Sequence, residues 1–358
     1  MKVNKFLALT AVFATLFAGC EEIIDDLGNG TGNTESNTET GGAGTETDTT
    51  QGGTEPEEDT LIFANFTCLK TLEGHSDIVQ SAAWNNDGTR IASGSWDNTL
   101  KIWDVNNGTC LQTLEGHVNR VNEVCWSPDG MYLASGSYDG TLRIWDANSG
   151  AFLRILHAER FWVDCVCWSP DGMYLASDSD TRNIKILDAN SGECLQTLTG
   201  HATMVHSLAF SPDGRYLASG SEDGIIKIWD LNSGTCLRTL EGHSSIVGYV
   251  SWSPDGMYLA SGSNDKTVKI WNATGGACLR TLEGHSEGVL PVNWSPDGKY
   301  LVSGSVDTNF KIWDANSGAC LRTFEEHTGM VNSVAFSPDG NYILSCSDDK
   351  TIKIWGVE

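Results

Sequence analysis

The sequence predicts an all-β protein, a ring of seven blades in which each blade is a four-stranded antiparallel sheet. One observation is a repeat of 42 residues that recurs seven times, without insertion or deletion, from residue 65 to residue 358. Another is the content of most copies, which carry a Gly-His pair near the start and a Trp-Asp pair near the end. A period in this range with these two marks is typical of propeller blades. One blade cannot bury its own apolar faces, so the copies must stack into a ring.

Two columns of the repeat show its regularity. The histidine column contains His75, His117, Glu159, His201, His243, His285 and His327. The tryptophan column contains Trp103, Trp145, Leu187, Trp229, Trp271, Trp313 and Trp355. Only the third copy departs from both columns. A ring of this size buries enough apolar surface to fold without disulfides.

The first 20 residues carry the features of an export signal. Two lysines form a basic start, and residues 6–18 form an apolar run that is too short for an ordinary membrane span. The end of the segment, small residues followed by Cys20, resembles a bacterial lipoprotein cleavage site, although Phe17 stands where that family most often has Leu. The resemblance implies that Cys20 is lipidated and anchors an exported chain at the cell envelope, on the bacterial outer membrane or the cell surface. An ordinary secreted protein and an uncleaved anchor are the alternatives.

Residues 21–60 form an acidic segment, rich in Gly and Thr, that has almost nothing to bury. This composition favours a disordered tether between the anchor and the ring, which we place at residues 61–358. Of the formal net charge of −25, −10 lies in the first 60 residues and −15 in the rest of the chain. Binding to nucleic acid needs a basic surface, so we expect no nucleic-acid partner.

Residues 109–157 illustrate how each element of a copy follows from its sequence. Residues 110–114 form an outer strand, and a Gly-His loop leads from it into an alternating strand at 121–126. The Ser-Pro-Asp-Gly sequence at 127–130 predicts a tight turn, because proline presets the second position and glycine accepts a positive φ. Strands at 132–137 and 141–145 follow, so the blade is an antiparallel meander.

Over residues 65–358 this pattern closely resembles the WD-repeat β-propeller family, which implies a seven-bladed ring. The chain begins with an outer strand at 68–72 and ends with a third strand at 351–355, so the first strand should complete the last blade. That pairing would remove the open sheet edges that invite aggregation.

The resemblance also implies a buried hydrogen-bonded chain within each complete blade, formed by the Trp, a Ser, the His and a turn Asp. Its expected members are His75, Ser93, Asp97 and Trp103 in blade 1; His117, Ser135, Asp139 and Trp145 in blade 2; His201, Ser219, Asp223 and Trp229 in blade 4; His243, Ser261, Asp265 and Trp271 in blade 5; His285, Ser303, Asp307 and Trp313 in blade 6; and His327, Ser345, Asp349 and Trp355 in blade 7.

The same residue types also form the catalytic set of many hydrolases. A hydrolase needs one nucleophile, whereas this chain carries six equivalent sets, so we favour the structural interpretation and expect no catalytic residue. Blade 3 loses three members together, with Glu159, Thr181 and Leu187 in place of His, Asp and Trp, and Asp178 replaces a glycine. Only Ser177 remains. The loss indicates either drift or a blade that is free to bind something.

Partners of the WD-repeat family often dock on the face that bears the Gly-His loops. Three positions of each blade point there: the third and the fifth residue after the histidine, and the residue before the turn Asp. Blades 1 to 3 gather aromatic and charged side chains at these positions, of the types that dominate interface hot spots. The candidate partner site contains Trp96, Arg120, Tyr138, Trp162, Asp164 and Asp180. Packing of these side chains against neighbouring loops is the alternative.

The eleven cysteines, with His157 and His206, do not form a metal framework. A disulfide between Cys125 and Cys167, which hold equivalent positions in adjacent blades, is less favoured than two free thiols, and so many thiols fit poorly with an oxidising compartment unless burial protects them. We expect no metal and no cofactor. Six cysteines share one outer-strand position with Phe152, which indicates apolar packing; they are Cys68, Cys110, Cys194, Cys236, Cys278 and Cys320.

The sequence therefore predicts a non-catalytic scaffold that binds a protein or a peptide and is displayed on a monomeric, membrane-tethered ring at the cell envelope. A carbohydrate-binding surface protein is the first alternative, because aromatic side chains flanked by carboxylates also suit sugars. An enzyme with a site on the axis of the ring is the second alternative.

Overall fold

The computed structural model describes residues 63–158, 162–178 and 182–358 of the chain. Within these ranges it contains 28 strands in seven four-stranded antiparallel sheets, which are the blades of a propeller. No helix in the described ranges is long and apolar enough to cross a membrane. The predicted signal segment, Cys20 and the tether at 21–60 all lie outside the described residues.

The strands of each blade are given in order from the innermost to the outermost. Blades 1 to 3 contain β2 (Val79–Trp84), β3 (Arg90–Ser95), β4 (Leu100–Asp104) and β5 (Cys110–Leu114); β6 (Val121–Trp126), β7 (Tyr132–Ser137), β8 (Thr141–Asp146) and β9 (Phe152–Ala158); and β10 (Val166–Trp168), β11 (Tyr174–Asp178), β12 (Ile184–Asp188) and β13 (Cys194–Leu198). Blades 4 and 5 contain β14 (Val205–Phe210), β15 (Tyr216–Ser221), β16 (Ile226–Asp230) and β17 (Thr235–Leu240); and β18 (Val247–Trp252), β19 (Tyr258–Ser263), β20 (Val268–Asn272) and β21 (Cys278–Leu282). Blades 6 and 7 contain β22 (Val289–Trp294), β23 (Tyr300–Ser305), β24 (Phe310–Asp314) and β25 (Cys320–Phe324); and β26 (Val331–Phe336), β27 (Ile343–Ser347), β28 (Ile352–Gly356) and β1 (Thr67–Leu72).

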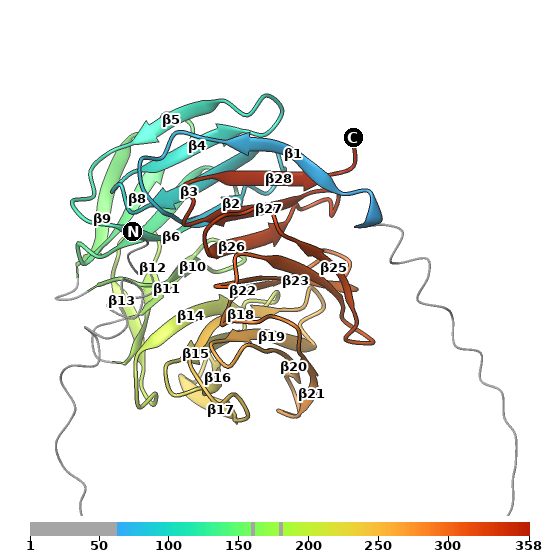
Figure 1. Ribbon diagram of the computed structural model, residues 1–358. Coiled ribbons are helices and arrows are strands. Elements are labelled where there is room, and N and C mark those ends of the chain that lie inside the picture. The colour runs from blue at the N-terminus through green and yellow to red at the C-terminus, as the bar shows by residue number, and fades with distance from the viewer. Residues whose placement is uncertain (1–62, 159–161, 179–181) are drawn as a thin grey trace, which may run out of the picture. The chain divides into compact units, whose positions relative to one another are not determined.

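The first strand of the chain closes the ring. β1 pairs antiparallel with β28, and the register runs from Thr67 opposite Gly356 to Leu72 opposite Ile352. Figure 1 shows the blue β1 lying beside the red β28. The prediction that the N-terminal strand completes the last blade is therefore confirmed.

The turns of the repeat are those that the residues predict. In blade 2 the amide of Gly130 donates to the carbonyl oxygen of Ser127 at 2.8 Å, and Gly130 has a φ of 70°, which favours glycine. The Asp129 carboxylate accepts hydrogen bonds from the Ser127 hydroxyl at 2.6 Å and the Met131 amide at 2.9 Å. These bonds fix the direction in which the next strand starts.

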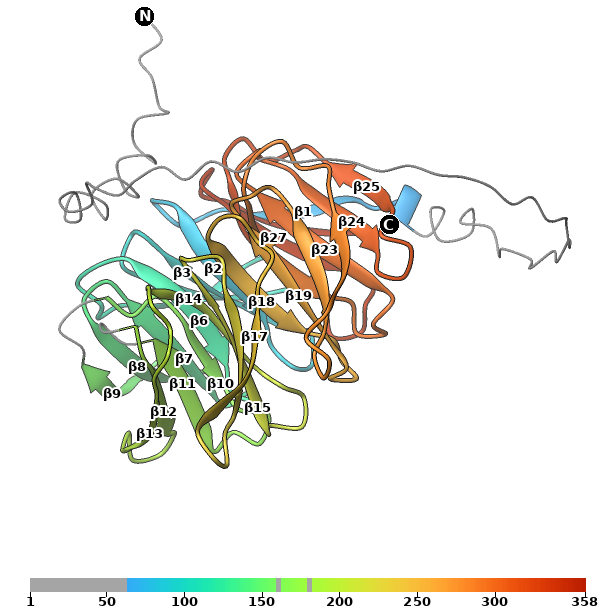
Figure 2. The same cartoon turned by 90° about the horizontal axis from the view of Figure 1, so that it is seen from below.

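The apolar core lies between neighbouring blades. Between blades 1 and 2, Leu100 and Leu114 of the first blade pack with Val121, Leu133 and Trp145 of the second, and all five side chains are buried. An equivalent cluster joins each adjacent pair of blades, so every blade needs both neighbours. Figure 2 shows the blades arranged around the ring, with β8–β13 and β23–β25 on opposite sides of it.

Candidate functional site

The buried polar chain forms in full in blades 1, 2, 5, 6 and 7. In blade 1 the His75 Nδ1 lies 2.9 Å from the Asp97 carboxylate, the His75 Nε2 lies 2.8 Å from the Ser93 hydroxyl, and the Trp103 indole N–H donates to that hydroxyl at 2.8 Å. The same three contacts measure 2.7–2.9 Å in the other four blades, around His117, His243, His285 and His327.

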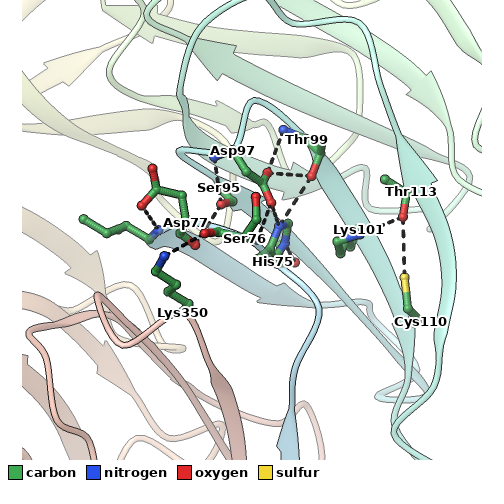
Figure 3. Close-up of polar contacts among 12 residues, drawn as sticks. His75, Ser76, Asp77, Ser95, Asp97, Thr99, Lys101, Cys110, Thr113 and Lys350 are labelled. Atoms are coloured by element: carbon green, nitrogen blue, oxygen red, sulfur yellow. Dashed lines mark hydrogen bonds and ion pairs between the residues drawn. The ribbon is translucent and has the colours of Figure 1, made fainter.

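The turn aspartate joins the Gly-His loop to the turn before the third strand. Besides His75, Asp97 accepts hydrogen bonds from the Ser76 amide at 3.0 Å and the Thr99 hydroxyl at 2.6 Å, as Figure 3 shows. Burial raises the pKa of Asp97, but the hydrogen bonds from His75 and Thr99 outweigh it and hold that pKa far below its usual range. The pKa of Asp307 in blade 6 is lowered to about 2 against the same effect of burial, with His285 as the main partner. The aspartate is therefore a charged, fixed support for the surface loops.

Blade 4 does not complete this chain. His201 contacts the Ser219 hydroxyl at 2.7 Å, and the Trp229 indole donates to the same hydroxyl at 2.8 Å. The prediction that Asp223 is the last member is wrong, because the buried Nδ1 of His201 has no hydrogen-bond partner in the part of the chain that the structure describes. Burial lowers the pKa of His201 to about 4.

The hydroxyl of Thr203 explains the missing contact. In blade 2 the Asp139 amide donates to the Ser137 hydroxyl at 3.0 Å, which seats the aspartate beside its histidine. In blade 4 the Thr203 hydroxyl lies 2.8 Å from the equivalent Ser221 hydroxyl and accepts the hydrogen bond of the Asp223 amide at 3.0 Å. The turn is thus held by Thr203, and the carboxylate does not reach the ring of His201.

Blade 3 replaces the chain with a different arrangement. Glu159 and Thr181 lie outside the described residues. Among the residues that are described, the buried Ser177 hydroxyl donates only to the carbonyl oxygen of Asp178, at 3.1 Å. The Asp178 carboxylate accepts hydrogen bonds from the backbone amides of Asp164 and Cys165, both at 3.0 Å. The inner strand β10 accordingly starts only at Val166 and has three residues, whereas the other inner strands have six.

The predicted aromatic residues of blades 1 to 3 lie against one another. The Arg120 guanidinium carbon lies 3.8 Å from the centre of the Trp96 ring and 5.9 Å from that of the Tyr138 ring. Tyr138 and Trp162 stack with their ring centres 4.8 Å apart and an angle of 18° between the rings. Trp96, Arg120, Tyr138 and Trp162 therefore form one continuous row, which we call the aromatic corner. Trp162 is 36% exposed, and the other three are half-buried.

The backbone fixes where these side chains start. The Trp96 amide donates to the carbonyl oxygen of Ile78, and the Tyr138 amide donates to that of Arg120, both at 2.9 Å. The residue before the turn Asp is thereby tied to the third residue after the histidine in every blade whose pair is described. The sixth predicted member of the site, Asp180, lies outside the described residues.

Asp164 of blade 3 lies next to the corner and contacts side chains of blades 2 and 4. Its carboxylate accepts a hydrogen bond from the Asn122 amide group at 2.9 Å and lies 3.9 Å from the His206 ring. Burial raises the pKa of Asp164, and the charge of His206 opposes the rise. Burial and the charge of Asp164 raise the pKa of Asp178 well above its usual range. A cationic group from a partner would lower both pKa values, so this position suits a basic side chain.

Seven segments of the chain match one family pattern, that of the WD domain, G-beta repeat. The matched residues are 66–104, 108–146, 150–188, 192–230, 234–272, 276–314 and 318–356. The chain belongs to the WD40 family. Blade 3 is matched as well, although it lacks most of the polar chain that the other WD40 blades of this ring contain.

Individual WD40 repeats of other proteins resemble parts of this ring. A segment of 41 residues is 56% identical to the vegetative incompatibility protein HET-E-1 of Podospora anserina, and covers 12% of this chain and 3% of that protein. Another of 39 residues is 49% identical to the small ribosomal subunit protein RACK1 of Dictyostelium discoideum (11% and 12%). A third of 44 residues is 48% identical to a component of chromatin assembly factor 1 of Mus musculus (12% and 8%). The chain thus spans a small part of the length of each of these relatives.

The inner strands of the WD40 ring enclose an axial channel of about 450 Å³. Glu123, Cys125, Cys167 and Tyr249 line it. Glu123 accepts a hydrogen bond from the Ser81 hydroxyl of the preceding blade at 2.9 Å, and burial raises its pKa to about 7. No group of three or more His, Cys, Asp or Glu side chains within the described ranges could hold a metal ion.

Residues 284–288 read Gly-His-Ser-Glu-Gly, which has the G-x-S-x-G spacing of the nucleophile elbow of hydrolases. They form the loop between β21 and β22, whereas that elbow joins a strand to a helix. The His285 ring in this loop already contacts Asp307 and Ser303 of its own blade. The motif is therefore one copy of the repeated Gly-His loop.

All ten cysteines within the described ranges are free thiols, Cys125 and Cys167 included. The interpretation of the shared outer-strand position as apolar packing is wrong for most of its members. Five of the six thiols are exposed, and Phe152 is 47% exposed, although it contacts Trp145. Each of the five exposed thiols instead donates to the backbone carbonyl oxygen two residues further along its own strand.

Proposed function

We propose that this WD40 ring is a non-catalytic scaffold that binds a peptide segment of a partner protein at the aromatic corner. The observation that carries the proposal is the continuous row of Trp96, Arg120, Tyr138 and Trp162. Trp, Tyr and Arg dominate interface hot spots because they offer large contact areas with few rotatable bonds. The row is partly exposed, and Trp162 at its end presents the most open surface.

An unsatisfied donor supports the proposal. The Trp96 indole N–H is buried and has no hydrogen-bond partner among the described residues. A buried donor without an acceptor destabilises a protein by about 1–3 kcal/mol. A partner that presents a carbonyl oxygen to the indole N–H would satisfy this donor.

The acidic side of the corner defines the expected chemistry of the partner. Asp164 lies beside Tyr138, since the charge of Asp164 contributes to the raised pKa of the Tyr138 hydroxyl, after burial. A lysine or arginine of the partner would meet Asp164 while an apolar side chain covers Trp162. Two of the relatives carry names that describe components of larger assemblies, the ribosomal protein and the chromatin assembly factor, which agrees with a scaffold.

The location of the ring is part of the proposal. The export signal, the lipidation of Cys20 and the acidic tether together predict a monomeric ring held at the cell envelope. Labelled fatty acid should enter the wild-type chain and not Cys20→Ala, which should also leave the membrane fraction. If no labelled fatty acid enters the wild-type chain, the lipid anchor is contradicted. That result would not bear on the proposed binding site.

A pull-down from the envelope of the native organism tests the binding site. The bait is the full chain, and the test variant is Trp96→Ala/Tyr138→Ala/Trp162→Ala. The matched control is Val306→Ala/Met330→Ala, which truncates equivalent positions in blades 6 and 7. We expect a protein that the wild type and the control retain and the test variant loses.

Equal retention by all three baits would contradict the proposed site. If none retains a protein, the stacked Tyr138 and Trp162 with the neighbouring Asp164 favour a sugar ligand, because aromatic faces and carboxylates are the groups that bind sugars. A glycan array would then show binding that the test variant loses.

A further inference from the structure

The chain fills one of its own interblade grooves with two phenylalanines. Phe63 and Phe66 precede β1, and both are buried, at 3% and 4% exposure. The Phe63 ring meets the Tyr300 ring edge-on at 4.9 Å and lies 6.3 Å from the Phe336 ring. This groove lies between blades 6 and 7. Phe63 belongs to a helical turn, which Figure 1 shows next to the C-terminus.

An arginine on the outermost strand of blade 6 holds this segment by its backbone. The Arg322 guanidinium donates hydrogen bonds to the carbonyl oxygens of Phe63 and Ala64. The groove therefore recognises two features of the segment, an aromatic side chain on a helical turn and a pair of carbonyl oxygens.

The groove between blades 5 and 6 contains the same residue types one repeat earlier. Tyr258, Arg280 and Trp294 stand 42 residues before Tyr300, Arg322 and Phe336. They line an open groove of about 450 Å³ together with Pro254 and Asp297. A volume of this size is typical of sites that bind ligands.

Side-chain exposure shows that this second groove is uncovered. Tyr300 is buried at 6% and Phe336 at 8%, whereas Tyr258 and Trp294 are half-buried. The Tyr258 and Trp294 rings stack at 6.4 Å with an angle of 29° between them, so they form one aromatic wall.

Arg280 differs from its equivalents in other blades. Arg154 and Arg238 stand at the same position and donate to carbonyl oxygens of the next blade, Ala189 at 2.9 Å and Thr274 at 3.1 Å. The guanidinium of Arg280 has no hydrogen bond or ion pair within the described ranges, and it lines the open groove. A cation at this place complements the carbonyl oxygens of an extraneous segment, as Arg322 does for Phe63 and Ala64.

We propose that the groove between blades 5 and 6 binds a partner segment with two phenylalanines three residues apart on a helical turn. Arg280 would donate to the backbone carbonyl oxygens of the turn, and Tyr258 and Trp294 would contact the first phenylalanine. The chain's own Phe63 does not reach this groove, because β1 begins at Thr67, directly after Phe66, and pairs with β28 in blade 7. The groove lies at the Ser-Pro-Asp-Gly turns, the opposite ends of the inner strands from the Gly-His loops, so the proposal does not depend on the aromatic corner.

A synthetic peptide with the sequence of residues 60–67, Thr-Leu-Ile-Phe-Ala-Asn-Phe-Thr, is the probe. Isothermal titration of the full chain should give one bound peptide per ring, and none for the same peptide with both phenylalanines changed to alanine. The variant Phe63→Ala/Phe66→Ala opens the equivalent groove and should bind two peptides.

Arg280→Gln should weaken binding of the peptide to the wild-type ring by about tenfold, since hydrogen bonds from a charged donor are the stronger ones. The matched control is Arg238→Gln, whose guanidinium already has an acceptor within the ring, and it should leave the affinity unchanged. Trp96→Ala should also leave it unchanged, which separates this groove from the aromatic corner.

Two results would overturn the proposal. One is the absence of binding to the wild-type ring, including the case in which only the Phe63→Ala/Phe66→Ala variant binds the peptide. The other is binding that Arg280→Gln does not weaken relative to Arg238→Gln.

Discussion

The Thr203 hydroxyl accepts the hydrogen bond of the Asp223 amide at 3.0 Å, and this contact distinguishes blade 4 from the five blades in which the polar chain is complete. The lack of a hydroxyl at residue 225 is not the reason that Asp223 misses its histidine. Blade 6 has Asn309 at the equivalent position, and its Asp307 still contacts His285 at 2.9 Å. We therefore infer that the side chain of Thr203 diverts the aspartate.

Thr203→Ala should complete the polar chain of blade 4. Without the threonine hydroxyl, the Asp223 amide would donate to Ser221, as its equivalents do, and the carboxylate would reach the Nδ1 of His201. The pKa of His201 should then rise from about 4. Titration of the histidine ring signals by NMR measures this pKa. Ser245→Ala, at the same position in blade 5, is the control and should leave the His243 signals unchanged.

The same variant should change the acid stability of the ring. A histidine with an ordinary pKa of 6.5 and a folded pKa of about 4 binds fewer protons in the folded chain than in the unfolded chain. The free energy of unfolding therefore falls as the pH drops from 6.5 toward 4, by roughly 3 kcal/mol for a shift of this size. Thr203→Ala should reduce this loss. An equal loss in the variant and the wild type, measured by urea unfolding, would contradict the explanation.

Ser135→Ala should destabilise the ring more than Ser177→Ala. The Ser135 hydroxyl contacts both His117 and the Trp145 indole, so its removal leaves two buried polar groups unpaired. We expect a loss of about 2–4 kcal/mol. Ser177 has the same place in blade 3, and within the described ranges it donates only to the carbonyl oxygen of Asp178, so its loss should be about 1 kcal/mol or less. Chemical unfolding measures both losses of stability. Equal losses would show that the buried polar chain contributes little to the stability of the ring.

Glu123→Gln should stabilise the ring at high pH. Burial raises the pKa of Glu123 from an ordinary 4.5 to about 7, so the folded chain holds a proton that the unfolded chain releases. The contribution of the protonated Glu123 to the free energy of unfolding is fully present below pH 4.5 and is lost as the pH rises through 7. At pH 8.5 the variant should exceed the wild type by about 2–3 kcal/mol, and at pH 4 the two should be similar. The exposed Glu115→Gln is the control, and a difference between Glu123→Gln and the wild type that does not vary with pH would contradict the prediction.

Arg120→Ala should uncover Trp96 at the aromatic corner. The stacked contact contributes about 0.5–1 kcal/mol at a partly exposed site, so the change in the free energy of unfolding should be small. Capture of the partner in the pull-down should fall much more, because the variant removes one member of the row. Met204→Ala, at the equivalent position in blade 4, should affect neither quantity. A variant that binds the partner as the wild type does would place the binding energy elsewhere.

The fold followed from the repeat, but several contacts of the site did not. The period of 42 residues places the strands of blade 2 and the closing strand at the positions that the structure shows, because each turn residue recurs at a fixed spacing. The row from Trp96 to Trp162 was predictable as a set of neighbours, because equivalent positions of adjacent blades lie side by side.

The missed contacts involve residues that leave the pattern of the repeat. The hydrogen bond that holds the Asp223 amide at Thr203 depends on one hydroxyl, at a position whose residue varies between blades. Asp178 binds two backbone amides, which no spacing rule describes. Phe63 precedes the first copy, and Phe66 stands where the other copies have glycine, so no column of the repeat predicts their groove. Two phenylalanines beside a polar segment were nevertheless a signal.

The pairing of β1 with β28 has a consequence for how the protein is made. The strand that leaves the ribosome first waits for a partner that leaves it last, so the ring stays open throughout synthesis and through any transport of the unfolded chain. Contacts between such distant segments form slowly, because a long loop must close before they add stability. A chain that stops before Ile352 would keep six blades and leave β1 with an unpaired edge, and such an edge favours association with other strands.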